Sequence, residues 1–191
     1  MLICGIDEAG RGPLAGNVFA AAVILNTDDV IPGLDDSKKL SEKKREALFS
    51  VIKDQAVAWA VSEATVDEID KMNILQASLL AMKRAFDKIR HISCKEIYVD
   101  GSCCPQLASP CSAVVGGDSL IPAVSAASIL AKVSRDRYCS DLHQLYPQYN
   151  FIQHKGYPTQ QHFVLLDKYG PSPVHRRSFA PVKRCLHKLS C

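Results

Sequence analysis

The most constraining feature of the sequence is a pair of short apolar runs near its start, separated by a glycine-rich segment. "LICGI" (2–6) and "VFAAAVIL" (18–25) have the length and composition of strands, and "EAGRGPLAGN" between them is rich in turn residues. We therefore predict a hairpin. Asp7 and Glu8 follow the first run directly, so two adjacent carboxylates lie where the predicted strand gives way to a flexible, cationic loop.

Further strands and helices follow along the chain. Apolar, β-rich runs predict strands, and apolar residues three and four positions apart predict helices. Ser41 and Thr65 are suited to cap helix N-termini, and Thr65 with Glu68 has the form of a capping box. The predicted strands are 57–64, 95–101 and 112–118, and the predicted helices are 41–55, a short one opening at 65–68, 73–90, 121–148 and 159–170.

The two longer predicted helices each have an expected apolar face. For the helix at 73–90 it is Leu75, Leu79, Met82, Phe86 and Ile89. For the helix at 121–148 it is Ile129, Val133, Leu142 and Leu145, preceded by small residues that suit close packing against a sheet.

The length of 191 residues, with 47% hydrophobic and 23% charged residues, predicts a single domain over 1–191. Residues from about 170 to 191 form a basic C-terminal tail in this interpretation. No apolar run is long enough to span a bilayer, and the first residues lack a secretory signal, so we expect a cytoplasmic protein. The eight cysteines are then expected as reduced thiols, and their spacing matches zinc sites poorly. Because no heptad repeat is present, we expect a monomer.

Charge is distributed unevenly along the chain. Residues 153–191 carry a net charge of +6 and the remainder −3, within a total of +3. An acidic body with a basic C-terminal region suits a protein that gathers phosphates near a carboxylate site. A solvated basic end without a binding role is the alternative, and charge alone does not decide between them.

Four acids stand out because each lies at a predicted strand end or in a glycine turn: Asp7, Glu8, Asp100 and Asp118. Converging carboxylates repel one another, so such a set implies hard cations with oxygen ligands, Mg²⁺ or Mn²⁺. Neighbouring strand residues point to opposite faces, however. Asp7 and Glu8 can both serve one ion only if the strand kinks or if Glu8 contributes its backbone carbonyl.

Six blocks in order carry a resemblance to a known family: "GIDEAGRGPLAG", "DSKKLSEKKRE", "YVDG", "VSAASILAKVSRDR", "HKGY" and "HRRSF". Over nearly the whole chain they resemble ribonuclease HII, of the prokaryotic type 2 ribonuclease H family. The resemblance implies an α/β, ribonuclease H-like fold, with a mixed sheet flanked by helices. It also implies metal-dependent hydrolysis of RNA in RNA–DNA hybrids and incision at single ribonucleotides in duplex DNA.

The resemblance also assigns roles to residues. The four catalytic, metal-binding acids of the family fall on Asp7, Glu8, Asp100 and Asp118. The ribonucleotide-sensing turn falls on Gly10, Arg11 and Gly12, and the recognition tyrosine on Tyr157, where both would contact the 2′-hydroxyl that separates RNA from DNA. Phosphate contacts are expected from five cations in matching blocks: Lys38, Lys39, Lys132, Arg135 and Lys155.

Two departures from the family pattern are visible. Gly116 stands two positions before Asp118, where the family commonly has lysine, so a supporting charge near Asp118 is expected to be missing. Asn17 replaces a proline after "LAG", which concerns only the loop. Arg11, and a chain without an added N-terminal domain, favour ribonuclease HII over the related ribonuclease HIII group.

The function implied is a two-metal-ion endonuclease, with one ion activating water and the other stabilising the departing 3′ oxygen, which leaves 5′-phosphate and 3′-hydroxyl ends. Two alternatives stay open. A non-catalytic hybrid-binding protein would use its acids only to order loops, and a metalloenzyme for small phosphate esters would have no use for the basic C-terminal region.

Overall fold

The predicted hairpin is present in the computed structural model, which describes residues 1–189. Strand β1 (Leu2–Ala9) pairs antiparallel with β2 (Val18–Asn26), and the register is unbroken from Leu2 opposite Asn26 to Ala9 opposite Phe19. The first strand is therefore longer than its apolar run, and Asp7 and Glu8 lie inside it.

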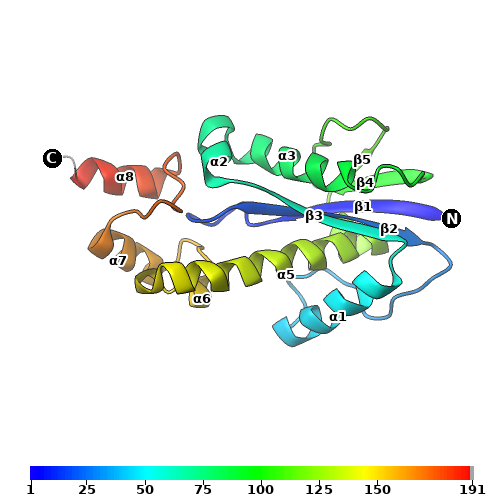
Figure 1. Ribbon diagram of the computed structural model, residues 1–191, viewed down its shortest axis with the longest axis horizontal. Helices are drawn as coiled ribbons and strands as arrows, with labels where there is room; N and C mark the ends of the chain where they lie inside the picture. The colour runs from blue at the N-terminus through cyan, green and yellow to red at the C-terminus, as the bar shows by residue number, and fades with distance from the viewer. Residues whose placement is uncertain (190–191) are drawn as a thin grey trace.

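Three more strands complete a mixed five-stranded sheet in the order β3-β2-β1-β4-β5 (Figure 1). Strand β3 (Ala58–Ala64) pairs antiparallel with β2. Strand β4 (Glu96–Asp100) runs parallel to β1, and β5 (Ser112–Val114) runs parallel to β4. The expected mixed sheet flanked by helices is confirmed. Because β1 and β4 are parallel, their carboxyl ends meet at one edge, the usual place for a site in such sheets.

Helices cover both faces of the sheet. Helices α2 and α3 lie on one face, α1 and α5 on the other, and α6, α7 and α8 lie beyond one end (Figure 1). No helix within residues 1–189 has the length and hydropathy needed to cross a membrane. The bounds are α1 (Glu42–Gln55), α2 (Val66–Met72), α3 (Ile74–Asp87), α4 (Gly117–Leu120), α5 (Pro122–Leu145), α6 (Phe151–His154), α7 (Gln160–Tyr169) and α8 (Ala180–Leu189), with a 3₁₀ turn at Pro147–Tyr149.

The predicted helix caps are confirmed. The Ser41 side chain accepts a hydrogen bond from the Lys44 N–H at the start of α1. Thr65 and Glu68 form both bonds of a capping box at the start of α2.

Alternation along the strands divides the core into two layers. In β1, Cys4 and Ile6 belong to the layer under α3, whereas Ile3 faces the layer under α5. Gly5 also faces α5, and a Cβ there would lie 2.1 Å from the backbone of Ala123. The absence of a side chain at this position therefore lets the start of α5 lie directly on the sheet. By the same alternation, Asp7 faces α5.

Two expected core positions are wrong. Leu75 and Leu145 are 36% and 71% exposed, because each lies at an end of its helix, beyond the part that covers the sheet. The buried side of α3 is formed largely by smaller residues, which allow the helix to lie close to β2 and β3. This side consists of Ala77, Ser78, Ala81, Met82, Ala85 and Phe86.

The basic segment at 170–191 differs from the expected tail. Helix α8 follows a buried stretch in which His175 and Arg176 are fully inaccessible to solvent. Val182 and Cys185 of α8 pack in a cluster with Leu14. The segment thus closes one end of the molecule; Ser190 and Cys191 lie outside the described residues.

Candidate active site

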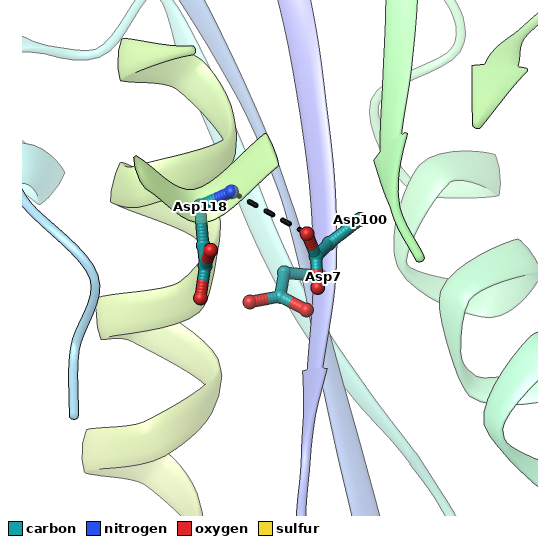
Figure 2. Close-up of side chains that lie close together, drawn as sticks. All are labelled: Asp7, Asp100 and Asp118. Atoms are coloured by element: carbon teal, nitrogen blue, oxygen red, sulfur yellow. Dashed lines mark hydrogen bonds between the residues drawn. The ribbon is translucent and has the colours of Figure 1, made fainter. Parts of the chain in front are cut away.

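Three of the four predicted acids converge at the carboxyl edge of β1 and β4. Asp7, Asp100 and Asp118 each offer a carboxylate oxygen within 4.8 Å of the others (Figure 2). Asp7 comes from β1 and Asp100 from the last position of β4. Since Val99 faces the layer under α3, Asp100 turns to the opposite side, where Asp7 also points.

Asp118 reaches the cluster by a route that differs from the prediction. The strand expected at 112–118 ends at Val114, and Asp118 lies in the first turn of α4. Gly116 precedes this helix with a φ of 72°, a left-handed conformation that a β-carbon disfavours. The Asp118 N–H then donates to Asp100 Oδ1 at 3.4 Å, which ties the two carboxylate-bearing segments together (Figure 2).

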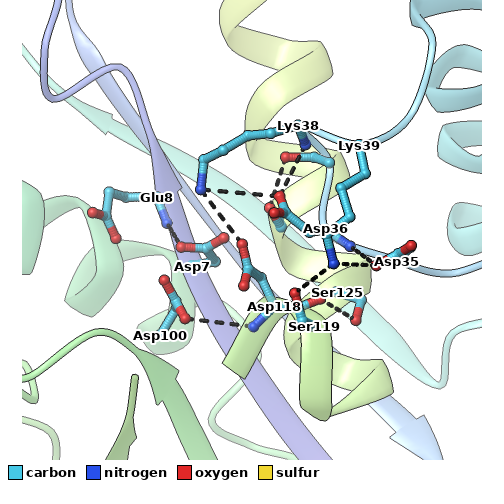
Figure 3. Close-up of polar contacts among 12 residues, drawn as sticks. Asp7, Glu8, Asp35, Asp36, Lys38, Lys39, Asp100, Asp118, Ser119 and Ser125 are labelled. Atoms are coloured by element: carbon cyan, nitrogen blue, oxygen red, sulfur yellow. Dashed lines mark hydrogen bonds and ion pairs between the residues drawn. The ribbon is translucent and has the colours of Figure 1, made fainter. Parts of the chain in front are cut away.

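The Glu8 carboxylate lies on the other side of β1. Of the two alternatives left open by the sequence, the kink is absent, since the β1–β2 register continues regularly through Ala9. The Glu8 side chain therefore points away from that of Asp7 (Figure 3). Its carboxylate pairs with Arg11 at 3.3 Å. The structure brings together Asp7, Asp100 and Asp118 and leaves the Glu8 side chain outside that group.

The main chain of Glu8 has a different orientation from its side chain. The Leu2 carbonyl accepts from the Lys95 N–H on the β4 side, and a strand residue directs its N–H and C=O to the same neighbour, with alternation along the strand. Glu8, six residues on, thus presents its carbonyl to the β4 side. Pairing of β1 with β4 ends at Ile6 opposite Val99, so this carbonyl lies on the open edge next to Asp100.

The carboxylates of the cluster are electrostatically frustrated. Burial, followed by the charges of Glu8 and Asp100, raises the pKa of Asp7 well above its ordinary value. Burial and the Asp100 charge likewise raise the pKa of Asp118. Burial also raises the pKa of Glu8, against the effect of Arg11. Crowded, partly buried carboxylate oxygens are the donor set that a hard divalent cation requires, so the residues fit Mg²⁺ or Mn²⁺.

Lys38 supplies a positive charge beside Asp118, contrary to the expectation that such a charge is missing. Its ammonium lies 3.5 Å from Asp118 Oδ2 and 3.9 Å from Asp36 Oδ1 (Figure 3). Burial opposes the charge, but Asp36, Asp118 and Asp7 together raise the pKa of Lys38. The loop before α1 thus provides a positive charge beside Asp118.

A cavity of about 190 Å³ adjoins the carboxylates and is lined by the residues that were predicted to recognise the ribonucleotide. Gly10, Arg11 and Gly12 line it together with Tyr157, which is 41% exposed. Gly10 has a φ of 97°, and a Cβ there would lie 2.8 Å from Arg135 Nε. A Cβ on Gly12 would lie 3.4 Å from the Tyr157 ring.

The remaining predicted cations occupy different environments. Lys132 lines the cavity and pairs with Asp136 at 2.7 Å, and Lys39 contacts Asp35 and Ser119 (Figure 3). Lys155 is partly buried, in a left-handed conformation.

Arg135 is a correction to the predicted phosphate contacts. It is only 2% exposed, and its guanidinium donates to the carbonyls of Ala15 and Lys155. It therefore braces two loops from inside the protein instead of facing a substrate.

Sequence reasoning missed several residues around the site. Ser37 and Ser128 line the cavity and share a hydrogen bond of 2.9 Å, and Ser128 also bonds Asp7 and lowers its pKa against the larger effect of burial. Three buried residues contact the Gly10–Gly12 turn or Tyr157, directly or through one another: His162, His175 and Arg176. The "HRRSF" block was the available signal for two of these, but spacing alone does not distinguish a buried arginine from a solvated one.

Known proteins resemble this chain over nearly its whole length. The family model described as Ribonuclease HII matches residues 4–182. The chain belongs to the ribonuclease HII family. A curated ribonuclease HII from Dechloromonas aromatica (strain RCB) is 58% identical over 188 residues, which cover 98% of this chain and 95% of the relative. Membership of this family makes the chain a metal-dependent nuclease of the ribonuclease H type.

Solved structures of ribonucleases H share the fold. Ribonuclease H2 from Pyrococcus horikoshii OT3 superposes with a TM-score of 0.79 at 29% identity, over 100% of this chain and 99% of that one. The structure of Bst-RNase HIII in complex with Mn²⁺ superposes with a TM-score of 0.77 over 98% of this chain and 70% of that one. At 16% identity, this second likeness concerns the fold alone.

Proposed function

We propose that this protein is an endonuclease that hydrolyses the RNA strand of RNA–DNA hybrids and incises duplex DNA at embedded ribonucleotides. The observation that carries the proposal is the convergence of Asp7, Asp100 and Asp118 within 4.8 Å beside a cavity lined by Gly10–Gly12 and Tyr157. Residues suited to cutting and residues suited to recognising ribose therefore share one depression.

Asp7, Asp100 and Asp118 would hold two divalent cations, Mg²⁺ or Mn²⁺, with the Glu8 carbonyl as a further oxygen ligand on the open edge of β1. When bound, such ions supply an activated water and stabilise the leaving 3′ oxygen of a phosphodiester. The Mn²⁺ complex of Bst-RNase HIII supports divalent cations as the cofactor. The products would carry 5′-phosphate and 3′-hydroxyl ends.

Ribose recognition falls to the turn and the tyrosine. Gly10 and Gly12 lack side chains, so the main chain can approach the 2′-hydroxyl, and the half-exposed Arg11 would contact the adjacent phosphate. The Tyr157 ring would pack on the next sugar. Lys38, Lys39, Lys132 and Lys155 lie around this region and would contact phosphates, with Lys38 exchanging its carboxylate partners for the substrate.

The deciding experiment is incision of duplex DNA that contains one ribonucleotide, with Mg²⁺, with Mn²⁺ and with a chelator. We expect cutting only with a divalent cation, none of an all-DNA duplex, and loss of cutting in Asp100→Asn. Binding without cutting would instead favour the hybrid-binding alternative. Hydrolysis of small phosphate esters, with duplex binding insensitive to salt, would favour the second alternative, because contacts to several phosphates weaken steeply as salt rises.

We also propose that the protein acts as a single-domain, cytoplasmic monomer that removes ribonucleotides from DNA after replication and during repair. Its family membership supports this role. Sedimentation analysis of the purified protein tests the oligomeric state, and ribonucleotide content of genomic DNA in a strain lacking the gene tests the role.

A further inference from the structure

A fully buried arginine, Arg176, lies behind the Gly10–Gly12 turn. Arg176 donates through Nη2 to the Gly10 carbonyl at 2.6 Å, through Nη1 to the Arg11 carbonyl at 2.9 Å and through Nε to the Gly16 carbonyl at 2.9 Å. Three donors of one rigid guanidinium thus hold both ends of the turn. The backbone adds to this, since the Arg176 N–H donates to the Leu14 carbonyl at 2.8 Å.

These contacts determine which way the peptide groups of the turn face. In a trans peptide, the carbonyl of one residue points opposite to the N–H of the next. With the Gly10 and Arg11 carbonyls directed inward to Arg176, the N–H groups of Arg11 and Gly12 face away from it, on the side of the cavity that both residues line. Within residues 1–189, neither N–H has a protein acceptor, so both are available to a ligand.

Burial of the Arg176 guanidinium costs solvation free energy. Arg176 has no carboxylate within ion-pair distance among the described residues, and burial, followed by the charge of Arg135, lowers its pKa to about 9. A buried charge without a counter-ion is normally avoided unless hydrogen bonds compensate it. Here the compensation is the set of turn carbonyls, together with the face of Phe179, whose centroid lies 5.2 Å from the guanidinium carbon.

A chain of hydrogen bonds runs from His175, the residue before Arg176, through His162 to Tyr157. His175 Nδ1 accepts from the Ser172 N–H at 3.0 Å, so the proton of the neutral ring lies on Nε2. It donates to His162 Nε2 at 3.1 Å, which places the His162 proton on Nδ1, where it donates to the Tyr157 carbonyl at 3.0 Å. Burial keeps both rings neutral, with the pKa of His162 lowered to about 4 and that of His175 to about 3.

We propose that Arg176 and the His175–His162 pair are positioning residues that fix the Gly10–Gly12 turn and Tyr157 relative to each other, and thereby set the selectivity for a ribonucleotide. The proposal rests on the proposed function, since it concerns the residues assigned there to ribose recognition. Arg176 and His175 are adjacent, so one buried segment holds both the Gly10–Gly12 turn and, through His162, Tyr157.

The first test substitutes the arginine. Arg176→Lys keeps the positive charge, but a single ammonium cannot span three carbonyls arranged around a planar fork. The readout is the ratio of dissociation constants for an all-DNA duplex and for the same duplex with one ribonucleotide, measured by fluorescence anisotropy in EDTA. We expect this ratio to fall by about tenfold, as for the loss of one charge-assisted hydrogen bond. Arg84→Lys is the control, because Arg84 also donates to a backbone carbonyl, that of Glu63, but from α3 and outside the residues that line the cavity.

The second test separates positioning from simple stability. In His162→Asn, the side-chain amide can take the place of Nδ1–H and donate to the Tyr157 carbonyl, whereas His162→Leu has no donor. We expect the leucine variant to lose selectivity and the asparagine variant to recover part of it. In the wild-type protein, ¹⁵N spectra should show the Nδ1–H tautomer for His162 and the Nε2–H tautomer for His175.

The outcomes are distinct. A wild-type protein that binds both duplexes equally would overturn the proposed function together with this proposal. Selectivity of the wild type that persists in folded Arg176→Lys and His162→Leu would overturn this proposal alone. Should the arginine variant not fold, the histidine pair and the tautomers decide, and the opposite tautomers would contradict the chain of hydrogen bonds.

Discussion

The ammonium group of Lys38 lies 3.5 Å from Oδ2 of Asp118, although 80 residues separate the two in sequence. A flexible side chain thus partly neutralises a carboxylate that belongs to a crowded cluster. An ammonium and a divalent cation bind the same oxygens, so Lys38 would compete with a cation at Asp118 and would become free for a phosphate once the cation is bound.

Lys38→Gln should therefore change the affinities for Mn²⁺ and for the duplex in opposite directions. We expect Mn²⁺ to bind more tightly, because a competing charge is gone, while duplex binding weakens and the slope of log K against log salt decreases by about one. Calorimetric Mn²⁺ titration and anisotropy over a range of salt concentrations measure both. Lys43→Gln, on the exposed side of α1, is the control. Weaker Mn²⁺ binding in Lys38→Gln would contradict this account.

Asp100→Asn should abolish incision and yet stabilise the metal-free protein. Loss of a direct ligand should reduce activity by more than about 100-fold, since even outer partners of metal ligands contribute 10–100-fold. Removal of one charge from the cluster relieves repulsion, and about 1 kcal/mol would raise the melting temperature by roughly 2–4 °C. Melting curves with EDTA and with Mn²⁺ measure this, and the increase caused by Mn²⁺ should shrink. Asp54→Asn, an exposed residue of α1, should change neither quantity.

Gly10→Ala should impair the site beyond its effect on stability. Gly10 and Gly33 have φ values of 97° and 85°, so alanine at either position should cost about 1–2 kcal/mol of unfolding free energy. Only at Gly10 does the new Cβ meet a rigid neighbour, 2.8 Å from Arg135 Nε. Incision should then fall more than about tenfold in Gly10→Ala, equivalent to 1.4 kcal/mol of lost positioning, and little in Gly33→Ala. Equal activities in the two variants, after correction for folded fraction, would refute a role for the turn.

Stability should decrease as the pH falls below about 6.5, through the buried histidines. Burial lowers the pKa of His162 to about 4 and that of His175 to about 3, from 6.5. The unfolded chain therefore takes up more protons between these values, and the stabilisation present above pH 6.5 is lost progressively toward pH 3. Each histidine contributes up to about 1.4 kcal/mol per pH unit.

Asp7 acts in the opposite direction, because its raised pKa favours the folded state at low pH. The informative quantity is thus the difference between the wild type and His162→Asn in urea unfolding at pH 7 and at pH 5. The variant should show the smaller loss on acidification. An identical loss would mean that His162 does not titrate as described.

Much of the fold was predictable because it rests on local chemistry. Ser41, Thr65 and Glu68 cap helices through contacts within four residues, and the apolar runs of β1 and β2 pair across a loop whose composition identifies it. The place of Asp118 beside a glycine turn was predictable, but the element that carries it was not. Its actual element, α4, depends on a left-handed Gly116 and a bond to Asp100, neither of which has a local signature.

Contacts between distant parts of the chain account for the rest. Lys38 contacts Asp118 from 80 residues away, and Arg176 is buried against carbonyls instead of an acid. In the sequence, neither residue can be distinguished from a solvent-exposed lysine or arginine. The placement of Glu8 was deducible in one respect. Strand alternation already required its side chain to oppose Asp7, and a regular strand leaves only its backbone carbonyl for the shared edge.

The bond between Arg176 and Gly10 joins residues 166 positions apart. During synthesis, β1 and β2 emerge well before Arg176 and can pair early, but the carbonyls of the turn between them acquire their partner only after 166 further residues have been made. Contacts of such long sequence separation form late, because loop closure must precede them. A nascent chain that already carries Asp7, Asp100 and Asp118 would thus complete the Gly10–Gly12 turn last, so that recognition of a ribonucleotide would mature after the proposed catalytic acids are in place.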